Sequence, residues 1–210
     1  MTSQNEPQWL EWAKQLQSIA QIGLTYTKDQ YDIERFEAIR KIAAEIMARG
    51  SDTPVDKINE LFANQKGYAT PKVDVRGVIF RENAILLVKE LEDGRWTLPG
   101  GWADILESPR EAVEREVLEE SGFQTRATKL LSVFDRSKHP HIPPYPFHIY
   151  KIFIRCEITG GAPATNNETG GAEFFYEDAL PELSVSRITA GQISRFFEHL
   201  RQPDLPTDFD

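Results

Sequence analysis

One stretch of this sequence decides the fold: Gly101-Trp-Ala-Asp-Ile-Leu-Glu107-Ser-Pro-Arg-Glu-Ala-Val-Glu-Arg115-Glu116-Val-Leu-Glu119-Glu120-Ser-Gly122-Phe123. Its middle part predicts a helix over about 108–121, because Ser108 and Glu111 have the spacing of a capping box and Gly122 suits a helix end. One side of this helix is apolar and can pack on a sheet, through Ala112, Val113, Val117 and Leu118.

The acidic side of the same helix predicts a metal site. Glu116, Glu119 and Glu120 are three or four residues apart, so their carboxylates lie on one helix face. Three such anions repel one another unless a cation joins them, and carboxylate oxygens suit Mg²⁺ or Mn²⁺, ions that also bind phosphate. The alternative interpretation is an ordinary solvated helix face, where acidic residues are common.

The stretch from Gly101 to Phe123 resembles the Nudix box at every defining position. That pattern is Gly, five residues, Glu, seven residues, Arg-Glu, an aliphatic residue, any residue, Glu-Glu, any residue, Gly and an apolar residue. The resemblance implies an α/β fold, the Nudix α/β/α sandwich with a mixed sheet. It also implies a metal-dependent enzyme that hydrolyses the pyrophosphate bond of a nucleoside diphosphate linked to another moiety.

The resemblance also assigns roles to single residues of the box. Arg115 would orient the carboxylates, whereas by chemistry alone it could equally form an ordinary helix salt bridge. The implied ligands of Mg²⁺ or Mn²⁺ are Glu116 and Glu120 first, then Glu119 and the carbonyl of Gly101, with Glu107 behind them or at an additional ion.

The reaction needs a group that accepts a proton from water. Glu120 is one candidate and Glu173, expected on a strand after a long loop, is another; the sequence does not choose between them. Contacts to the substrate are expected from Arg76, Lys89 and Arg95 to phosphate, from Trp96 to a base, and from His139, each weighed against simple packing or exposure.

The first part of the chain predicts a small all-α domain over residues 1–67. Apolar residues at helical spacing indicate three helices: one that ends at Gly23, one from Asp29 to Gly50, and one that opens with Thr53 as its cap. From residue 68 to 205 the pattern predicts the Nudix domain, with strands at about 73–80, 84–88, 127–134, 147–157 and 173–176 and a last helix that carries Ile193, Phe196 and Phe197.

A second, less specific resemblance spans nearly the whole chain. The helices, the segment from Pro71 to Val78 and the segment from Leu180 to Arg187 look like a Nudix branch that includes CDP-choline pyrophosphatase and ADP-ribose pyrophosphatase-like proteins. This resemblance implies a homodimer and a CDP-choline-like substrate, which would give a nucleoside monophosphate and a phosphorylated alcohol. ADP-ribose hydrolysis and a non-catalytic nucleotide sensor are the alternatives, and the intact box glutamates disfavour the sensor.

The composition indicates where such a protein works. A net charge of -9 disfavours a stable complex with nucleic acid, because too few cations are left to neutralise phosphates. No run of residues is apolar and long enough for a membrane span, and the start of the chain lacks the apolar core of a secretory signal. With a single cysteine, Cys156, we expect no disulfide and a cytoplasmic protein.

Overall fold

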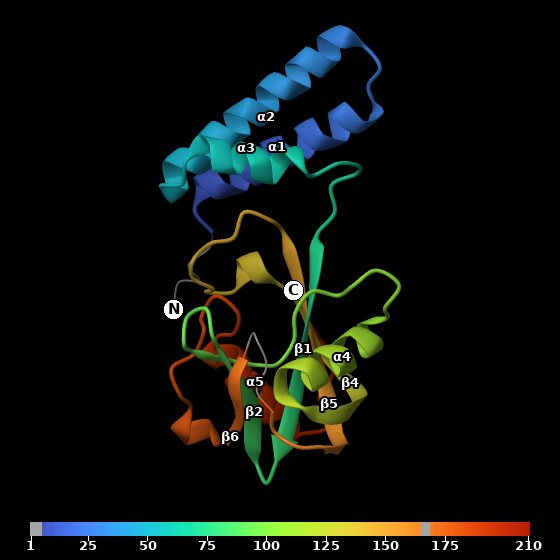
Figure 1. Cartoon of the computed structure of the whole chain (residues 1–210), viewed down its shortest axis with the longest axis vertical. Coiled ribbons are helices and arrows are strands. Elements are labelled where there is room, and N and C mark those ends of the chain that lie inside the picture. The colour runs from blue at the N-terminus through green and yellow to red at the C-terminus, as the bar shows by residue number, and fades with distance from the viewer. Residues whose placement is uncertain (1–5, 165–168) are drawn as a thin grey trace. The chain divides into compact units, whose positions relative to one another are not determined.

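The computed structural model describes residues 6–164 and 169–210, which divide into two compact units (Figure 1). One unit is helical and holds the described residues from Glu6 to Pro71 together with Pro144–His148. The other holds Lys72–Pro143 and Ile149–Asp210. The expected border at residues 67 and 68 lies close to the first of these borders, but the sequence pattern placed Pro144–His148 in the second domain.

The helical unit consists of α1 (Gln8–Tyr26), α2 (Gln30–Ser51) and α3 (Val55–Ala63). Leu10, Met47 and Phe62 are among the apolar side chains that form its core. Asp29 caps α2, since its carboxylate accepts hydrogen bonds from the backbone N–H groups of residues 31 and 32. The three expected helices are therefore present.

Two details of the predicted helices are wrong. Helix α1 continues past Gly23 to Tyr26, and a Cβ atom at Gly23 would overlap the ring of Phe36 on α2. This glycine therefore permits close packing of two helices instead of ending one. Thr53 is also not the cap of α3: Pro54 occupies that position, and no side chain caps the helix.

The second unit contains a mixed seven-stranded sheet in the order β3-β2-β1-β5-β4-β7, with β6 paired to β2. β1 runs parallel to β5 and β4 parallel to β7, whereas the other pairs are antiparallel. The strands are β1 (Lys72–Arg81), β2 (Ala84–Glu90), β3 (Trp96–Thr97), β4 (Phe123–Asp135), β5 (Ile149–Gly161), β6 (Thr169–Phe175) and β7 (Asp208–Phe209).

A helix covers each face of this sheet. Side chains of β1 alternate between the faces, so Val75 and Ile79 pack under α4 (Pro109–Ser121), while Val78 packs on the side of α5 (Ala190–Arg201). The cluster under α4 includes Val117, and the cluster at α5 includes Phe196. The result is the predicted α/β/α sandwich with a mixed sheet, which positions α4 rigidly against the start of β1.

Candidate active site

Helix α4 begins and ends where the box predicts. The Ser108 N–H donates to a Glu111 carboxylate oxygen at 2.9 Å, and the Glu111 N–H donates to Ser108 Oγ at 3.3 Å, so both halves of the capping box are formed. Gly122 ends the helix with a positive φ of 77°, a conformation that glycine adopts without strain. These two boundaries fix which helix positions face the sheet.

The acidic positions of α4 do not share one environment. Glu120 is buried, with 7% of its surface exposed, and shares the inner side of the helix with Val113 and Val117. The side chain of Glu116 is 13% exposed and that of Glu119 is 55% exposed. Leu118, which was expected on the apolar side, is largely exposed. The three carboxylates therefore differ in exposure, from the buried Glu120 to the exposed Glu119, and do not form a uniform solvated face.

Glu120 and Glu116 lie against the backbone of a loop, Leu98–Gly101, which we call the glycine loop. The Gly100 N–H donates to Glu120 Oε2 at 2.7 Å. A Cβ atom at Gly101 would come within 2.9 Å of Glu116 Oε2. Both carboxylates are thus held against the same short piece of main chain.

The glycine loop is itself fixed to β1. The N–H of Val75 donates to the Gly101 carbonyl and the N–H of Gly77 donates to the Pro99 carbonyl, both at 2.8 Å. Gly100 has a φ of 140° and lies so close to β1 that a Cβ atom would overlap the Val75 carbonyl oxygen. The Gly101 carbonyl keeps its second lone pair, which is compatible with its expected contact to a metal.

Arg115 connects the outer carboxylates. Its guanidinium binds Glu107 through two nitrogens at 2.7 and 2.8 Å. It also donates to Glu116 at 2.9 Å and to Glu119 at 3.0 Å. The hydrogen bond to Glu107 is the main reason that the pKa of Arg115 is raised, and it lowers the pKa of Glu107 in turn. Arg115 therefore contacts three box carboxylates at once, and its role in orienting them for a metal stays a prediction.

Burial changes the acidity of the two inner carboxyl groups. It raises the pKa of Glu120 to about 8; Arg76 and the Gly100 N–H act in the opposite direction, whereas Glu90 and Glu116 raise it further. Burial also raises the pKa of Glu116, against the influence of Arg115. Burial and mutual repulsion both disfavour the ionised forms of two neighbouring carboxyl groups. A cation bound between them would favour the ionised forms.

The donor set fits Mg²⁺ or Mn²⁺. Within residues 6–164 and 169–210 no three His, Cys, Asp or Glu side chains converge into a complete metal site. Mg²⁺ does not need one, because it usually takes one or two carboxylates and completes its shell with water and substrate phosphate. Glu116, Glu120 and the backbone of the glycine loop provide such a partial shell, and Glu119 stands further out.

The residues expected to bind phosphate lie elsewhere or are occupied. Arg76 is 5% exposed and binds Asp74 through two nitrogens, so it is a buried charge partner and not a free phosphate ligand. Arg95 forms an exposed ion pair with Glu182 at 2.8 Å. Lys89 is exposed on β2, opposite Trp96. The sequence cannot reveal such pairings, because they depend on which strands become neighbours.

Three other expected site residues are explained by packing or exposure. Trp96 packs against the cluster at α5, with its ring 4.8 Å from that of Phe175 in an edge-to-face contact, so it is not free to stack on a base. His139 lies 4.3 Å from the ring of Phe134, and its Nε2 is 3.2 Å from Asp210. Glu173 is exposed on β6, where it pairs with Leu87 of β2.

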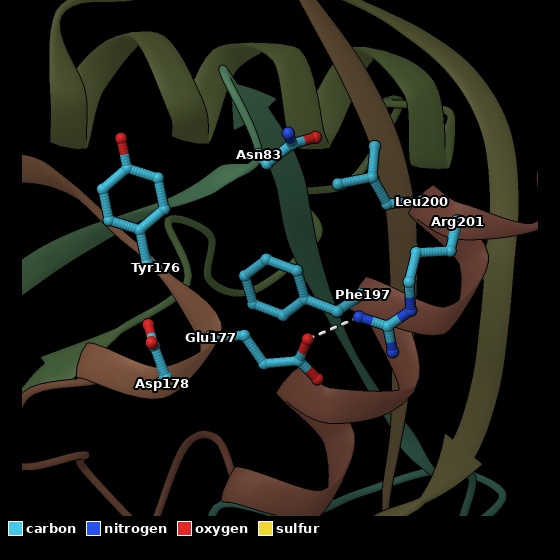
Figure 2. A pocket seen from close by; sticks show the side chains of 7 residues that line it. All are labelled: Asn83, Tyr176, Glu177, Asp178, Phe197, Leu200 and Arg201. Carbon is cyan, nitrogen blue, oxygen red and sulfur yellow. Dashed lines mark hydrogen bonds and ion pairs between the residues drawn. The ribbon is translucent and has the colours of Figure 1, made fainter.

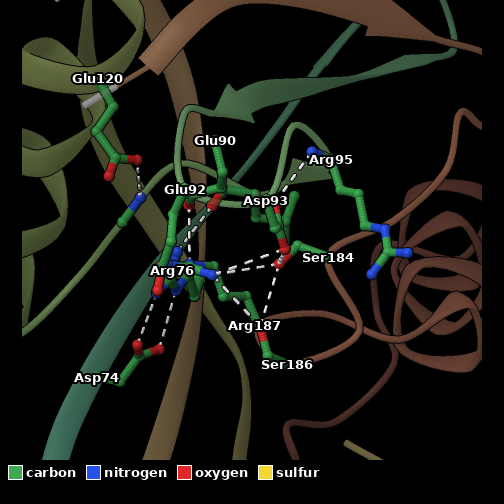
Figure 3. A network of polar contacts seen from close by, with 12 residues as sticks. Asp74, Arg76, Glu90, Glu92, Asp93, Arg95, Glu120, Ser184, Ser186 and Arg187 are labelled. Atoms are coloured by element: carbon green, nitrogen blue, oxygen red, sulfur yellow. Dashed lines mark hydrogen bonds and ion pairs between the residues drawn. The ribbon is translucent and has the colours of Figure 1, made fainter. Parts of the chain in front are cut away.

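A buried carboxylate was missed at the sequence level. Glu90 lies in β2 opposite Thr169 of β6, is 8% exposed, and pairs with Arg187 at 3.0 Å (Figure 3). Its charge acts on both Arg76 and Glu120. Strand alternation puts Glu90 on the same side of β2 as Leu86 and Val88, but nothing in the sequence indicated that its carboxylate would be buried, because its partner Arg187 lies far along the chain.

A hollow lies away from the box. It has a volume of about 580 Å³ and is lined by residues such as Asn83, Tyr176 and Phe197, with an ion pair between Glu177 and Arg201 on its wall (Figure 2). Asn83 belongs to the tight turn between β1 and β2, at the opposite end of β1 from the glycine loop. None of the expected site residues lines it.

The described residues also include no helix that combines the length and apolar character of a membrane span.

Comparison with known proteins identifies both units. Residues 7–62 match a family model described as a UDP-X-like, N-terminal oligomerisation domain, and residues 70–195 match the NUDIX domain. The protein named "Putative ADP-ribose pyrophosphatase YjhB" from Bacillus subtilis is 50% identical over 205 residues, which is 98% of each chain.

Two solved structures are also similar. A UDP-X diphosphatase is 32% identical, with a TM-score of 0.63 over 96% of this chain and 98% of that one. An ADP-ribose pyrophosphatase from Streptococcus suis is 38% identical, with a TM-score of 0.61 over 67% of this chain and all of that one. Together with the geometry at α4, these matches show that the chain belongs to the Nudix family and is a Nudix pyrophosphohydrolase.

Proposed function

We propose that this enzyme hydrolyses nucleoside diphosphates linked to a sugar-like group, with ADP-ribose as its first substrate to test. The observation that carries the reaction class is the pair Glu116 and Glu120, held by Arg115 and by the Gly100 N–H at the end of a capped helix. The choice of ADP-ribose rests on the 50% identical relative that matches over 98% of both chains. The expected CDP-choline substrate finds no support among the relatives described above.

The chemistry consumes one water molecule and yields two phosphate monoesters. A bound Mg²⁺ or Mn²⁺ would lower the pKa of that water and neutralise the leaving phosphate. Glu116 and Glu120 would hold the ion, while Arg115 keeps Glu107 and Glu116 in place. Glu120 is the proton acceptor that we favour over Glu173, because it adjoins the glycine loop, whereas Glu173 is exposed on β6.

A UDP-linked compound is the second candidate substrate. The observation in its favour is that the UDP-X diphosphatase structure aligns with this chain along 96% of its length, including the helical unit. The sensor hypothesis has less support, because every box glutamate is present and Glu116 and Glu120 both lie against the glycine loop.

A substrate panel tests the proposal. ADP-ribose, a UDP-sugar, CDP-choline, NADH and ATP would each be incubated with the full chain and Mg²⁺ or Mn²⁺, and the products separated by ion-exchange chromatography. We expect ADP-ribose to give the highest kcat/KM, with AMP and ribose phosphate as products. A higher value for another compound would replace ADP-ribose, and binding without any turnover would support the sensor instead.

The first prediction concerns Glu120. We expect Glu120→Gln to lower kcat by roughly a hundredfold or more, because the variant loses a carboxylate that positions the ion and takes up the proton. Glu119→Gln is the graded comparison on the same helix, and we expect a smaller loss because that side chain is 55% exposed. Thermal unfolding of both variants checks the fold, and near-normal turnover in Glu120→Gln would remove this residue from the site.

A further inference from the structure

Three charged side chains are buried together next to the glycine loop. Asp74 and Arg76 lie on β1, and Lys151 lies opposite Asp74 on β5. The Arg76 guanidinium donates to both oxygens of Asp74, at 3.0 and 2.8 Å (Figure 3). Lys151 Nζ donates to Asp74 Oδ1 at 2.7 Å. Burial alone would raise the pKa of Asp74, but the two cations bring it down to about 2, so this carboxyl group stays ionised.

The remaining terminal nitrogen of Arg76 reaches the glycine loop. It donates to the Leu98 carbonyl at 3.1 Å, two residues before the Gly100 N–H that binds Glu120. This side-chain contact adds to the two backbone hydrogen bonds between β1 and the loop. Asp74 accepts hydrogen bonds from the other two guanidinium nitrogens. The orientation of Arg76 is therefore fixed by contacts on both sides of its guanidinium group.

Stability alone does not account for this group of charges. Asp74 and Arg76 are each 5% exposed and Lys151 is 2% exposed, so all three have lost most of their hydration. Buried ion pairs of this kind are frequently no more stable than well-packed apolar residues of the same volume. Their position against the loop that contacts Glu120 therefore points to a functional reason.

We propose that Arg76, held in place by Asp74, is a positioning residue that fixes the glycine loop where the Gly100 N–H meets Glu120. This proposal rests on the proposed catalytic role of Glu120. In this role Arg76 acts through the Leu98 carbonyl, with no direct contact to substrate or metal.

The test compares two conservative substitutions in the full chain. Arg76→Lys keeps the charge but cannot bind Asp74 with two nitrogens and also reach Leu98. We expect kcat for the best substrate of the panel to fall roughly tenfold or more, with KM changed less than about threefold, because only the placement of the site is lost. The matched control is Arg195→Lys, since Arg195 binds Asp208 with two nitrogens at 2.8 and 2.7 Å on α5. There we expect kcat to stay within about twofold of the wild-type value.

A second readout does not depend on turnover. The amide resonance of Gly100 in a ¹H–¹⁵N spectrum reports its hydrogen bond to Glu120, and we expect it to shift in Arg76→Lys but not in Arg195→Lys. If no compound of the panel is hydrolysed by the wild type, the proposed function fails, while this resonance still decides whether Arg76 positions the loop.

Three results would overturn the proposal: an unchanged kcat together with an unchanged Gly100 resonance, a rise in KM alone, or an equal loss of kcat in Arg195→Lys. A rise in KM alone would indicate that Arg76 binds substrate directly. Should Arg76→Lys not fold, Asp74→Asn applies the same two readouts with the volume of the side chain preserved.

Discussion

At the scale of single residues, burial is the main cause that shifts the pKa of His141. His141 is 6% exposed, its Nδ1 lies 2.9 Å from the Val185 carbonyl, and its Nε2 lies 3.4 Å from the side chain of Gln192. Burial is the main cause that lowers its pKa to about 3; Lys151, Arg136 and His139 lower it further, whereas the bond to Val185 opposes them. His141 is therefore neutral in the folded protein.

We predict that His141 makes the fold sensitive to acid. In the unfolded chain a histidine titrates near 6.5, so below that pH the unfolded state takes up a proton that the folded state refuses until about pH 3. Stability is thus full above about 6.5 and falls by about 1 kcal/mol for each pH unit below about 6. The unfolding free energy of the wild type should drop more steeply between pH 6.5 and 4.5 than that of His141→Gln. Parallel curves for the two proteins would contradict this role.

Helix spacing alone predicts that Arg115, Glu116 and Glu119 are neighbours on α4, whereas their roles at a metal come from the resemblance to the Nudix box and stay predictions. The expected roles of Arg76, Trp96 and His139 depended on tertiary neighbours instead. Asp74 could have been noticed two residues before Arg76, but nothing in the pattern shows that both side chains turn inward beside Lys151. The sequence therefore revealed the chemistry of α4 and not its surroundings.

At the scale of elements, the turn that leads into α4 is strained. Its hydrogen bond joins the Glu107 N–H to the Asp104 carbonyl at 3.3 Å, and its third residue, Leu106, has a φ of 74°. That position favours glycine or asparagine. Leu106 is 98% exposed and Ile105 is 89% exposed, so neither side chain gains packing inside this unit in return.

We predict that relief of this strain stabilises the protein. We expect Leu106→Gly to raise the unfolding free energy, by up to about 1 kcal/mol, because the left-handed conformation costs glycine nothing although glycine gains freedom in the unfolded chain. Leu106→Ala keeps the strain and serves as the control, and urea titrations of both would measure the difference. A lower stability for Leu106→Gly than for Leu106→Ala would show that the turn is not strained.

Elements with a strong local signal were predicted well, and short ones were not. The capping box and Gly122 placed α4 to within a residue of its observed bounds, Pro109–Ser121. The two-residue strands β3 and β7 were not expected, because a strand of that length has no periodicity and exists only through its partner. Gly23 was assigned the wrong role for a related reason: the ring that packs over it comes from another helix.

At the scale of the whole molecule, the helical unit leaves several apolar side chains in contact with water. On α1, Trp12, Ile19 and Tyr26 are seven residues apart and are 51%, 52% and 66% exposed. A spacing of seven places them along one side of the helix. On α2, Tyr31 is 70% exposed and Ile42 is 51% exposed. Exposed apolar groups of this kind mark surfaces that bind another protein surface.

We predict that the full chain is a homodimer formed through this unit, in agreement with the description of the family that matches residues 7–62. Light scattering at micromolar concentration should give about twice the chain mass of 24.0 kDa. A charge at Ile19, as in Ile19→Glu, should shift the mass toward the monomer, whereas Leu130→Glu on β4 should not. A monomeric wild type would contradict the prediction.

The hydrogen-bond donor to Glu120 is the Gly100 N–H, which belongs to the main chain. No substitution other than proline removes this backbone group, although a Cβ atom at position 100 would overlap the Val75 carbonyl and displace the loop. Correlated changes between pairs of side chains would therefore never disclose this contact, and ordinary mutagenesis cannot delete it cleanly. Only a chemically synthesised or ligated protein with an ester in place of that one amide would isolate its contribution.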